Sequence, residues 1–205
     1  MGFFLRAKRR YDKILTSLLE KYEEHVDAIE IVNKMSERYM AIEGDFLDDE
    51  TREKHGEKAQ QGRNDSDFNM VVSKGKTKRK SIIKKKHLSK MYRRIVEKTH
   101  PDKLERLEMS DGEKQDRECV FKDVVPAYRK LNIPVFFECA NEVSVAPQHV
   151  GHYDFFSGAL VIEVEILEEK IKILKETVAW SLYECQGDPA CERALVQRTV
   201  NSIYK

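Results

Sequence analysis

Four consecutive residues, His100, Pro101, Asp102 and Lys103, have the chemistry to recognise a charged partner. Proline lacks a backbone N–H and disfavours helical geometry in the residue before it, so a helix that reaches Thr99 or His100 must end there. The stiffened backbone then fixes where the Asp102 carboxylate points. That carboxylate can accept a charge-assisted, bidentate hydrogen bond from an arginine of another protein.

His100 could instead be a catalytic base or a metal ligand, because histidine titrates near neutral pH. No second histidine, cysteine or carboxylate cluster stands around it at the spacing of a ligand set. We therefore expect no catalytic residue, no metal and no cofactor, and we expect that the chain is not an enzyme.

A run of cations precedes this motif, and from Lys74 to Arg94 the chain has no acidic residue. The basic side chains that we expect on one helix face are Lys84, Lys85, Lys86, Lys90, Arg93, Arg94 and Lys98. Such a face can be merely solvated, or it can hold nucleic acid through the phosphates. It has no aromatic residues on which single-stranded bases could stack, so we favour docking to a protein over nucleic acid.

Two predicted helices position these residues. The first has apolar residues at a spacing of three and four, which leaves the cations on the other side. These apolar residues are Leu88, Met91, Tyr92, Ile95, Val96 and Thr99. The second helix starts at Ser110, which forms a capping-box pattern with Glu113. Its apolar face is Val120, Phe121, Val124, Tyr128 and Leu131. Two amphipathic helices joined by a short polar loop predict an antiparallel hairpin.

This hairpin resembles helices II and III of a J domain, the module by which a co-chaperone switches on an ATP-driven heat-shock chaperone. In that family a basic helix with a Leu-x-x-x-Tyr-Arg pattern ends in His-Pro-Asp-Lys, and the opposing helix carries Phe-x-x-x-x-x-Ala-Tyr-x-x-Leu. The matching residues are Leu88, Tyr92, Arg93, His100, Pro101, Asp102, Lys103, Phe121, Ala127, Tyr128 and Leu131. The two helix patterns together are far more specific than the His-Pro-Asp sequence alone. The resemblance covers about a quarter of the chain.

The resemblance implies a binding surface for a DnaK-type chaperone, in which Asp102 meets an arginine at the interface of the nucleotide domain and the linker. The residues that it assigns to this surface are His100, Pro101, Asp102, Lys103, Lys85, Lys86, Lys90, Arg93, Arg94 and Lys98.

The chain departs from the family in three ways. Nothing between Phe68 and Ile83 resembles the short helix I, so another element must cover that face of the hairpin. Pro126 lies inside the second helix, where an interior proline costs roughly 3 kcal/mol and kinks the helix. The Gly/Phe-rich segment, zinc module and β-rich substrate-binding domain of the full-length bacterial co-chaperone are absent. The hairpin is similar to those encoded by large phages and other DNA viruses.

The N-terminal part of the chain is predicted to be a helical arm. Residues 1–44 are expected to form one long helix of coiled-coil type, which ends at Gly44 and needs a partner helix. Its predicted seam is Tyr11, Leu15, Leu18, Tyr22, Val26, Ile29, Val32, Met35 and Tyr39. Residues 45–75 lose this periodicity and are predicted to be a polar linker, and residues 76–145 form the J-domain-like module.

Residues 146–205 are predicted to form a C-terminal helical hairpin. It should follow a loop that contains Pro147, Gly151 and Gly158. The apolar residues of its first helix, at heptad-like spacing, are Leu160, Val164, Leu167, Ile171, Leu174 and Val178. We expect the large side chains of Trp180, Leu182 and Tyr183 to cover the J-domain-like helices in place of helix I.

The sequence Gly187-Asp188-Pro189 is typical of a helix stop, an N-cap and a first-turn proline. A final helix is therefore predicted to fold back over residues 190–204.

Composition favours long, solvent-exposed helices, because charged residues make up 36% of the 205 residues while Gly (9) and Pro (5) are scarce. Lys and Arg (37) nearly cancel Asp and Glu (36), so the net charge of +1 gives no argument for a nucleic-acid or membrane partner. No apolar run is long enough to cross a bilayer, and the first ten residues are too short and too basic for a secretory signal. We expect a cytoplasmic protein, with a virion as the alternative location, and no membrane partner.

The four cysteines, Cys119, Cys139, Cys185 and Cys191, include no C-x-x-C pair, so neither a zinc ribbon nor a redox motif is predicted. We expect buried thiols. Cys185 and Cys191 flank a turn and could approach each other, but in a reducing compartment we expect both to remain thiols.

These patterns together predict an all-α fold, with the J-domain-like hairpin between a long N-terminal helix and a C-terminal helical hairpin. The expected function is a co-chaperone that recruits a DnaK-type ATPase to a specific client or assembly and stimulates it. Homo-oligomers or a larger assembly could form through the terminal helices. The alternative is a helical structural or assembly protein, of virion type, that uses the J-like hairpin only as a scaffold.

Overall fold

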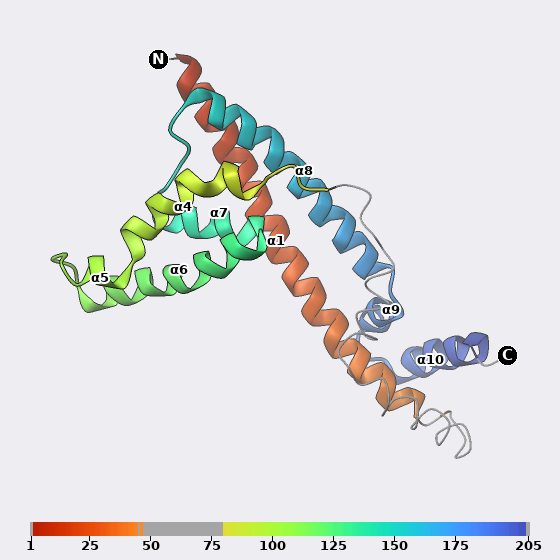
Figure 1. The fold of residues 1–205 in the computed structure, drawn as a ribbon. Helices are drawn as coiled ribbons and strands as arrows, with labels where there is room; N and C mark the ends of the chain where they lie inside the picture. The colour runs from red at the N-terminus through yellow and green to blue at the C-terminus, as the bar shows by residue number, and fades with distance from the viewer. Residues whose placement is uncertain (1, 45, 47–79, 204–205) are drawn as a thin grey trace. The chain divides into compact units, whose positions relative to one another are not determined.

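The computed structural model describes residues 2–44, 46 and 80–203, and this part of the chain is all helical, with no strand (Figure 1). Its helices are α1 (Gly2–Glu43), α4 (Lys85–Thr99), α5 (Pro101–Leu104), α6 (Asp111–Lys130), α7 (Ile133–Glu142), α8 (Val150–Lys175), α9 (Val178–Glu184) and α10 (Pro189–Ile203). The predicted all-α class is confirmed. Apart from Phe46, the predicted linker 45–75 lies outside the described residues. None of the described helices has the length and hydrophobicity needed to cross a membrane.

The long N-terminal helix is confirmed, since α1 has 42 residues and ends one residue before Gly44. Its buried stripe includes Ala7, Tyr11, Leu15, Leu18, Ala28 and Val32. The predicted seam is wrong at Val26 and Ile29, which are 44% and 38% exposed. At 3.6 residues per turn, Ala28 lies directly one turn before Val32, so it takes the buried position in this part of the helix.

Residues that contact one another fall into two compact units. The first combines residues 1–22 with 79–166, and the second combines 23–78 with 167–205. The predicted boundaries at residues 44, 75 and 145 follow the order of the chain, whereas each unit joins segments that are distant in sequence. This follows from the two longest helices, because α1 and α8 each contribute residues to both units.

In the first unit, α4 and α6 lie side by side and are joined through the short α5; we call these three elements the α4–α6 hairpin (Figure 1). The Ser110 hydroxyl accepts from the Glu113 N–H and the Glu113 carboxylate accepts from the Ser110 N–H, so the predicted capping box is confirmed. The side chains that α4 and α6 bury are Leu88, Met91, Ile95 and Thr99, and Val120, Val124 and Ala127.

The hairpin is covered by α7, a helix that the sequence pattern did not predict. Leu131 ends α6 in a left-handed conformation (φ 56°), and the chain turns back at once into α7. α7 packs on both α4 and α6 and buries Phe136 and Phe137 completely. The expected cover by Trp180 is wrong, because that side chain packs in the second unit against Ala28 and Val32 of α1.

α8 begins inside the segment predicted to be a loop. Gly151 and Gly158 both lie within this helix, so their placement in a loop is wrong. A Cβ at either position would meet nothing within 4 Å, which shows that neither glycine is required by a close approach. The first half of α8 belongs to the first unit, where Tyr153 stacks edge-on against Tyr11 of α1 with ring centres 5.3 Å apart. Burial raises the pKa of Tyr11 far above its ordinary value.

The predicted C-terminal helix is confirmed. Gly187 has a positive φ of 81°, and the Asp188 carboxylate accepts from the Ala190 N–H at 3.0 Å as α10 begins at Pro189. In the second unit, Val196 and Val200 of α10 form a cluster with Leu182 of α9, against which Met35 and Tyr39 of α1 pack.

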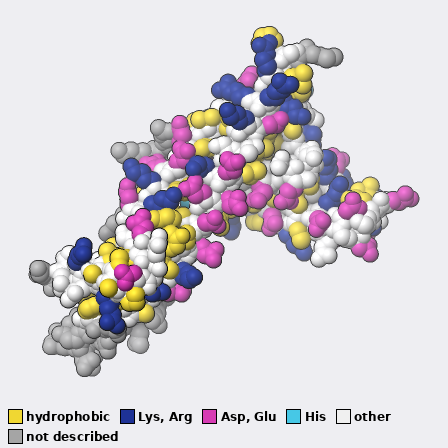
Figure 2. Space-filling model, turned by 180° about the vertical axis from the view of Figure 1, so that it is seen from behind, with side chains coloured by type: hydrophobic (Ala, Val, Ile, Leu, Met, Phe, Trp, Pro, Cys, Tyr) yellow, Lys and Arg dark blue, Asp and Glu magenta, His cyan; other side chains and the backbone are white. Residues whose placement is uncertain are grey.

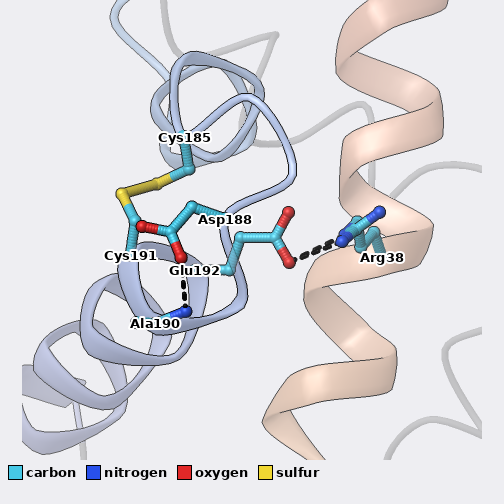
Figure 3. Close-up of a disulfide and its surroundings, with 6 residues drawn as sticks. All are labelled: Arg38, Cys185, Asp188, Ala190, Cys191 and Glu192. Atoms are coloured by element: carbon cyan, nitrogen blue, oxygen red, sulfur yellow. Dashed lines mark hydrogen bonds and ion pairs between the residues drawn. A yellow bond between two sulfur atoms is a disulfide. The ribbon is translucent and has the colours of Figure 1, made fainter.

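A disulfide joins Cys185 and Cys191 across the turn between α9 and α10 (Figure 3). The expectation that both would remain thiols is therefore wrong. The turn brings their Cα atoms to 5.7 Å, which is within the range of a disulfide. The adjacent Glu192 carboxylate is almost fully buried and pairs with Arg38 of α1 at 2.7 Å, so one short segment ties α9, α10 and α1 together.

Candidate functional site

His100 marks the end of α4, as predicted. Its backbone leaves the helical region (φ −64°, ψ 127°), and Pro101 opens α5 in the next position. The His100 ring nitrogen Nδ1 accepts a hydrogen bond from the Asp102 N–H at 3.3 Å. The histidine thus acts as the N-cap of α5, and it orients the backbone that carries Asp102.

The Asp102 side chain projects into solvent, with 83% of its surface exposed. His100 is more enclosed, at 38%, and its ring lies edge-on to Phe121 of α6 with centres 5.2 Å apart. Phe121 therefore holds the imidazole against the opposite helix of the hairpin, while the neighbouring carboxylate stays accessible. This arrangement presents a solvated carboxylate on an oriented backbone at the tip of the α4–α6 hairpin.

Lys103 and Glu97 form an exposed ion pair beside the tip, with Nζ and Oε1 3.4 Å apart. Glu97 places a negative charge at the end of the basic helix, next to the four-residue motif. The basic face is therefore interrupted just where it reaches Asp102, a detail that the count of cations along α4 did not predict.

The predicted cations of α4 divide into two sets. Lys85, Lys86, Lys90 and Arg93 are exposed. Arg94 and Lys98 are half-buried, and each donates to a main-chain carbonyl in the segment between α7 and α8.

The distances in these bonds are short. Arg94 Nη1 lies 2.6 Å from the Ala146 oxygen, and Lys98 Nζ lies 2.7 Å from the Val143 oxygen. The carbonyls at the end of a helix have no partner within it, so Lys98 satisfies a carbonyl that α7 leaves open at its C-cap. Arg94 bonds a carbonyl of the loop that follows. Arg94 and Lys98 thus hold the fold together as well as lining its surface.

Three contacts fix the spacing of α4 and α6. Tyr92 and Tyr128 stack with ring centres 4.1 Å apart and planes 10° from parallel. The Tyr128 hydroxyl approaches the Lys85 carbonyl at 3.5 Å, and Arg117 donates to the Lys98 carbonyl at 3.3 Å near the other end of α4. The tip is therefore positioned by contacts at both ends of the hairpin.

An open groove lies beside the tip. Its lining comprises Tyr92, Arg93, Val96, Glu97, His100, Asp102, Lys103 and Arg106. The groove brings the predicted motif together with Arg93 of the basic face, and it adds Arg106, which the sequence pattern did not single out. A partner side chain that entered it would contact apolar surface of Tyr92 and Val96 and charged groups of both signs.

A second hollow separates the basic face from the start of α8. Its cationic rim is formed by Lys86, Lys90 and Arg94, and Met91, Phe155 and Phe156 supply apolar surface. His87 also lines it, and burial, with the charges of Lys86 and Lys84, lowers the pKa of this histidine.

No group of three or more His, Cys, Asp or Glu side chains among the described residues is arranged to hold a metal ion. Cys139 is a buried thiol, as predicted, and burial raises its pKa to about 12. Cys119 is exposed, so the expectation of a buried thiol is wrong at that position.

Comparison with known proteins gives no match, whether to a protein-family model, to a curated protein or to a solved structure.

Proposed function

We propose that this chain is a co-chaperone that recruits a DnaK-type heat-shock chaperone to a specific client or assembly and stimulates its ATPase. The observation that carries the proposal is the His100–Lys103 motif at the tip of a helical hairpin, with an exposed Asp102 carboxylate and an oriented His100. The resemblance of the hairpin residues to a J domain supplies the class of partner.

The proposed contact has two parts. Asp102 accepts a charge-assisted hydrogen bond from an arginine of the chaperone, because its backbone is capped by His100 and its carboxylate is exposed. Lys85, Lys86, Lys90 and Arg93 attract an acidic surface of the chaperone and speed the encounter.

Arg94 and Lys98 were included in the docking surface on sequence grounds, and their bonds to Ala146 and Val143 favour a positioning role. In the proposal they hold the segment after α7 against α4, and α7 in turn covers the hairpin. Arg94 and Lys98 then affect docking indirectly, because they maintain the packing of the α4–α6 hairpin.

The direct test is single-turnover ATP hydrolysis by a DnaK-type chaperone, measured with and without this protein. We expect the hydrolysis rate to increase with the concentration of the protein and to saturate as the complex forms. A rate that stayed at its basal value at every concentration would contradict the proposal.

The contribution of the basic α4 side chains to chaperone association can be measured separately from that of the His100–Lys103 motif. The variant Lys86→Glu/Lys90→Glu should slow association with the chaperone and flatten its salt dependence, because reversed charges no longer steer the encounter. The matched control Lys122→Glu/Lys130→Glu reverses two exposed lysines on α6 and should leave association unchanged.

A helical assembly protein is the alternative function, and one observation favours it. Val26, Ile29 and Met40 are exposed on α1, where they lie within about 60° of one another around the helix axis and form a sparse apolar stripe beside the buried Ala28 and Val32. In that case the chain would associate with other helices through this stripe and would not change ATP hydrolysis. Analytical ultracentrifugation of the unchanged protein and of Val26→Ser/Ile29→Ser tests it. An oligomer that is lost in the variant, together with no stimulation of ATP hydrolysis by the unchanged protein, would support the alternative.

A further inference from the structure

The first turn of α1 exposes three large apolar side chains. Phe3 is 78% exposed, Leu5 51% and Phe4 39%. Phe4 is partly held by Tyr153 of α8, whose ring centre lies 5.4 Å away in an edge-on contact. The guanidinium of Arg6 lies 4.6 Å above the Phe3 ring. Adjacent exposed apolar side chains of this size are typical of a surface that binds something.

Cations follow in the next turn. Arg6, Lys8, Arg9 and Arg10 are all exposed, and the first acidic residue of α1 is Asp12. Figure 2 shows Lys and Arg side chains gathered around hydrophobic side chains in the upper part of the view, where α1 begins. The local charge is therefore strongly positive, although the whole chain has a net charge of only +1.

The angular distribution of these residues distinguishes between classes of partner. Successive residues of an α-helix are about 100° apart, so Phe3, Phe4 and Leu5 point in three directions around the axis. The four cations likewise surround the helix except where Ala7 and Tyr11 are buried. Side chains of a helix tilt toward its N-terminus, which moves the apolar ring to the extreme end.

A protein groove that receives a helix selects a stripe along one face, and this tip has no such stripe. Nucleic acid would engage the cations through phosphates but would leave Phe3 and Leu5 in water. An apolar tip with a ring of cations one turn behind it matches a lipid surface, where acyl chains lie beneath anionic headgroups.

We propose that the first two turns of α1 bind the surface of a membrane that contains anionic lipids. Phe3 and Leu5 enter the boundary between headgroups and acyl chains, and Arg6, Lys8, Arg9 and Arg10 contact the headgroups. The sequence-based expectation of no membrane partner rested on net charge and on the lack of a spanning segment. Neither criterion detects a local patch of apolar and cationic side chains such as the one at the start of α1. The membrane proposal does not depend on chaperone docking.

The test is sedimentation of the full chain with vesicles of phosphatidylcholine, with and without phosphatidylglycerol. We expect binding to the mixed vesicles and none to phosphatidylcholine alone. Phe3→Ser/Leu5→Ser and Arg9→Glu/Arg10→Glu should each weaken binding by about tenfold or more. Since these side chains are exposed, circular dichroism should show unchanged helix content in both variants.

Two matched controls test the location. Leu107→Ser replaces an apolar side chain that is 46% exposed in the loop between α5 and α6, and Lys85→Glu/Lys86→Glu reverses two exposed cations of α4. Both should bind mixed vesicles as the unchanged protein does. A Phe3→Trp variant should show a blue-shifted tryptophan emission when mixed vesicles are added. The unchanged protein, whose single tryptophan is Trp180, gives the background signal.

Three results would overturn the proposal. One is no sedimentation with mixed vesicles. Another is a set of results that would mean adsorption by charge alone. In that set, Arg9→Glu/Arg10→Glu loses vesicle binding, Phe3→Ser/Leu5→Ser keeps it, and Phe3→Trp shows no blue shift. The third is binding of duplex DNA or RNA that needs the same four cations and competes with the vesicles.

Discussion

His100 and Asp102 have different roles although they are two residues apart. The imidazole contacts Phe121 and caps α5, whereas the carboxylate is directed to solvent. Substituting His100 therefore affects both the tip's structure and its chemistry, and substituting Asp102 changes the chemistry almost alone. This makes Asp102 the more informative position for a functional test.

Lys98 illustrates what sequence could not predict at the scale of one residue. Its place in a basic run suggested a solvent-facing cation, yet its Nζ bonds the Val143 carbonyl at 2.7 Å. That partner exists only because α7 ends at Glu142 and the chain turns back towards α4. A partner formed by tertiary structure leaves no local signal in the spacing of lysines, and the same holds for Arg94 and Ala146.

Replacing Lys98 by alanine should destabilise the first unit by about 1 to 2 kcal/mol, because the Val143 carbonyl loses the charged donor of a partly buried hydrogen bond. Urea unfolding followed by circular dichroism measures the change, and hydrogen exchange should locate it after α7. The exposed Lys90→Ala is the matched control and should alter stability by less than about 0.5 kcal/mol. Equal losses in the two variants would show that the Val143 contact contributes nothing.

At the scale of helices, the confirmed predictions combine a periodic apolar face with a boundary signal. α1 ends before Gly44, α6 begins at the Ser110 capping box, and α10 begins after Gly187 and Asp188. α7 was missed because it is short and mostly apolar, so no polar face revealed its period. Pro134 in its first turn was an available signal, since proline is favoured there.

Pro126 lies inside α6, which continues through it to Lys130. Without an N–H at this position, one carbonyl of the preceding turn loses its helical partner. Pro126→Ala should therefore stabilise the first unit, by up to about 3 kcal/mol. Chemical denaturation monitored by helix signal tests this, with Lys122→Ala as a neutral change one turn earlier. An unchanged or lower stability would mean that the surrounding helices depend on the proline.

The disulfide between Cys185 and Cys191 closes a small loop between α9 and α10. Reducing it, or replacing Cys191 by serine, should cost the second unit about 2 kcal/mol, because the unfolded chain regains conformational freedom. The single tryptophan, Trp180, packs against Ala28 and Val32, so its fluorescence reports unfolding of this unit. Fluorescence-detected unfolding that was identical with and without reductant would contradict the prediction.

At the scale of the whole molecule, the two long helices α1 and α8 link two units of different character. The first unit contains the α4–α6 hairpin, its tip and the α7 cover, and the second contains the disulfide and the Arg38–Glu192 pair. Sequence order predicted the helices but not this division, because each unit draws on two distant segments. In the proposed function, the first unit carries the residues that dock the chaperone.

The measurement that tests chaperone docking most directly is single-turnover ATP hydrolysis by a DnaK-type chaperone in the presence of Asp102→Asn. This variant removes the charge of a side chain that is 83% exposed, so its unfolding curve should match that of the unchanged protein. Glu105→Gln, an exposed carboxylate three residues away, is the matched control. We predict stimulation by the unchanged protein and by Glu105→Gln, and none by Asp102→Asn. Undiminished stimulation by Asp102→Asn would contradict the assignment of the His100–Lys103 motif as the docking site.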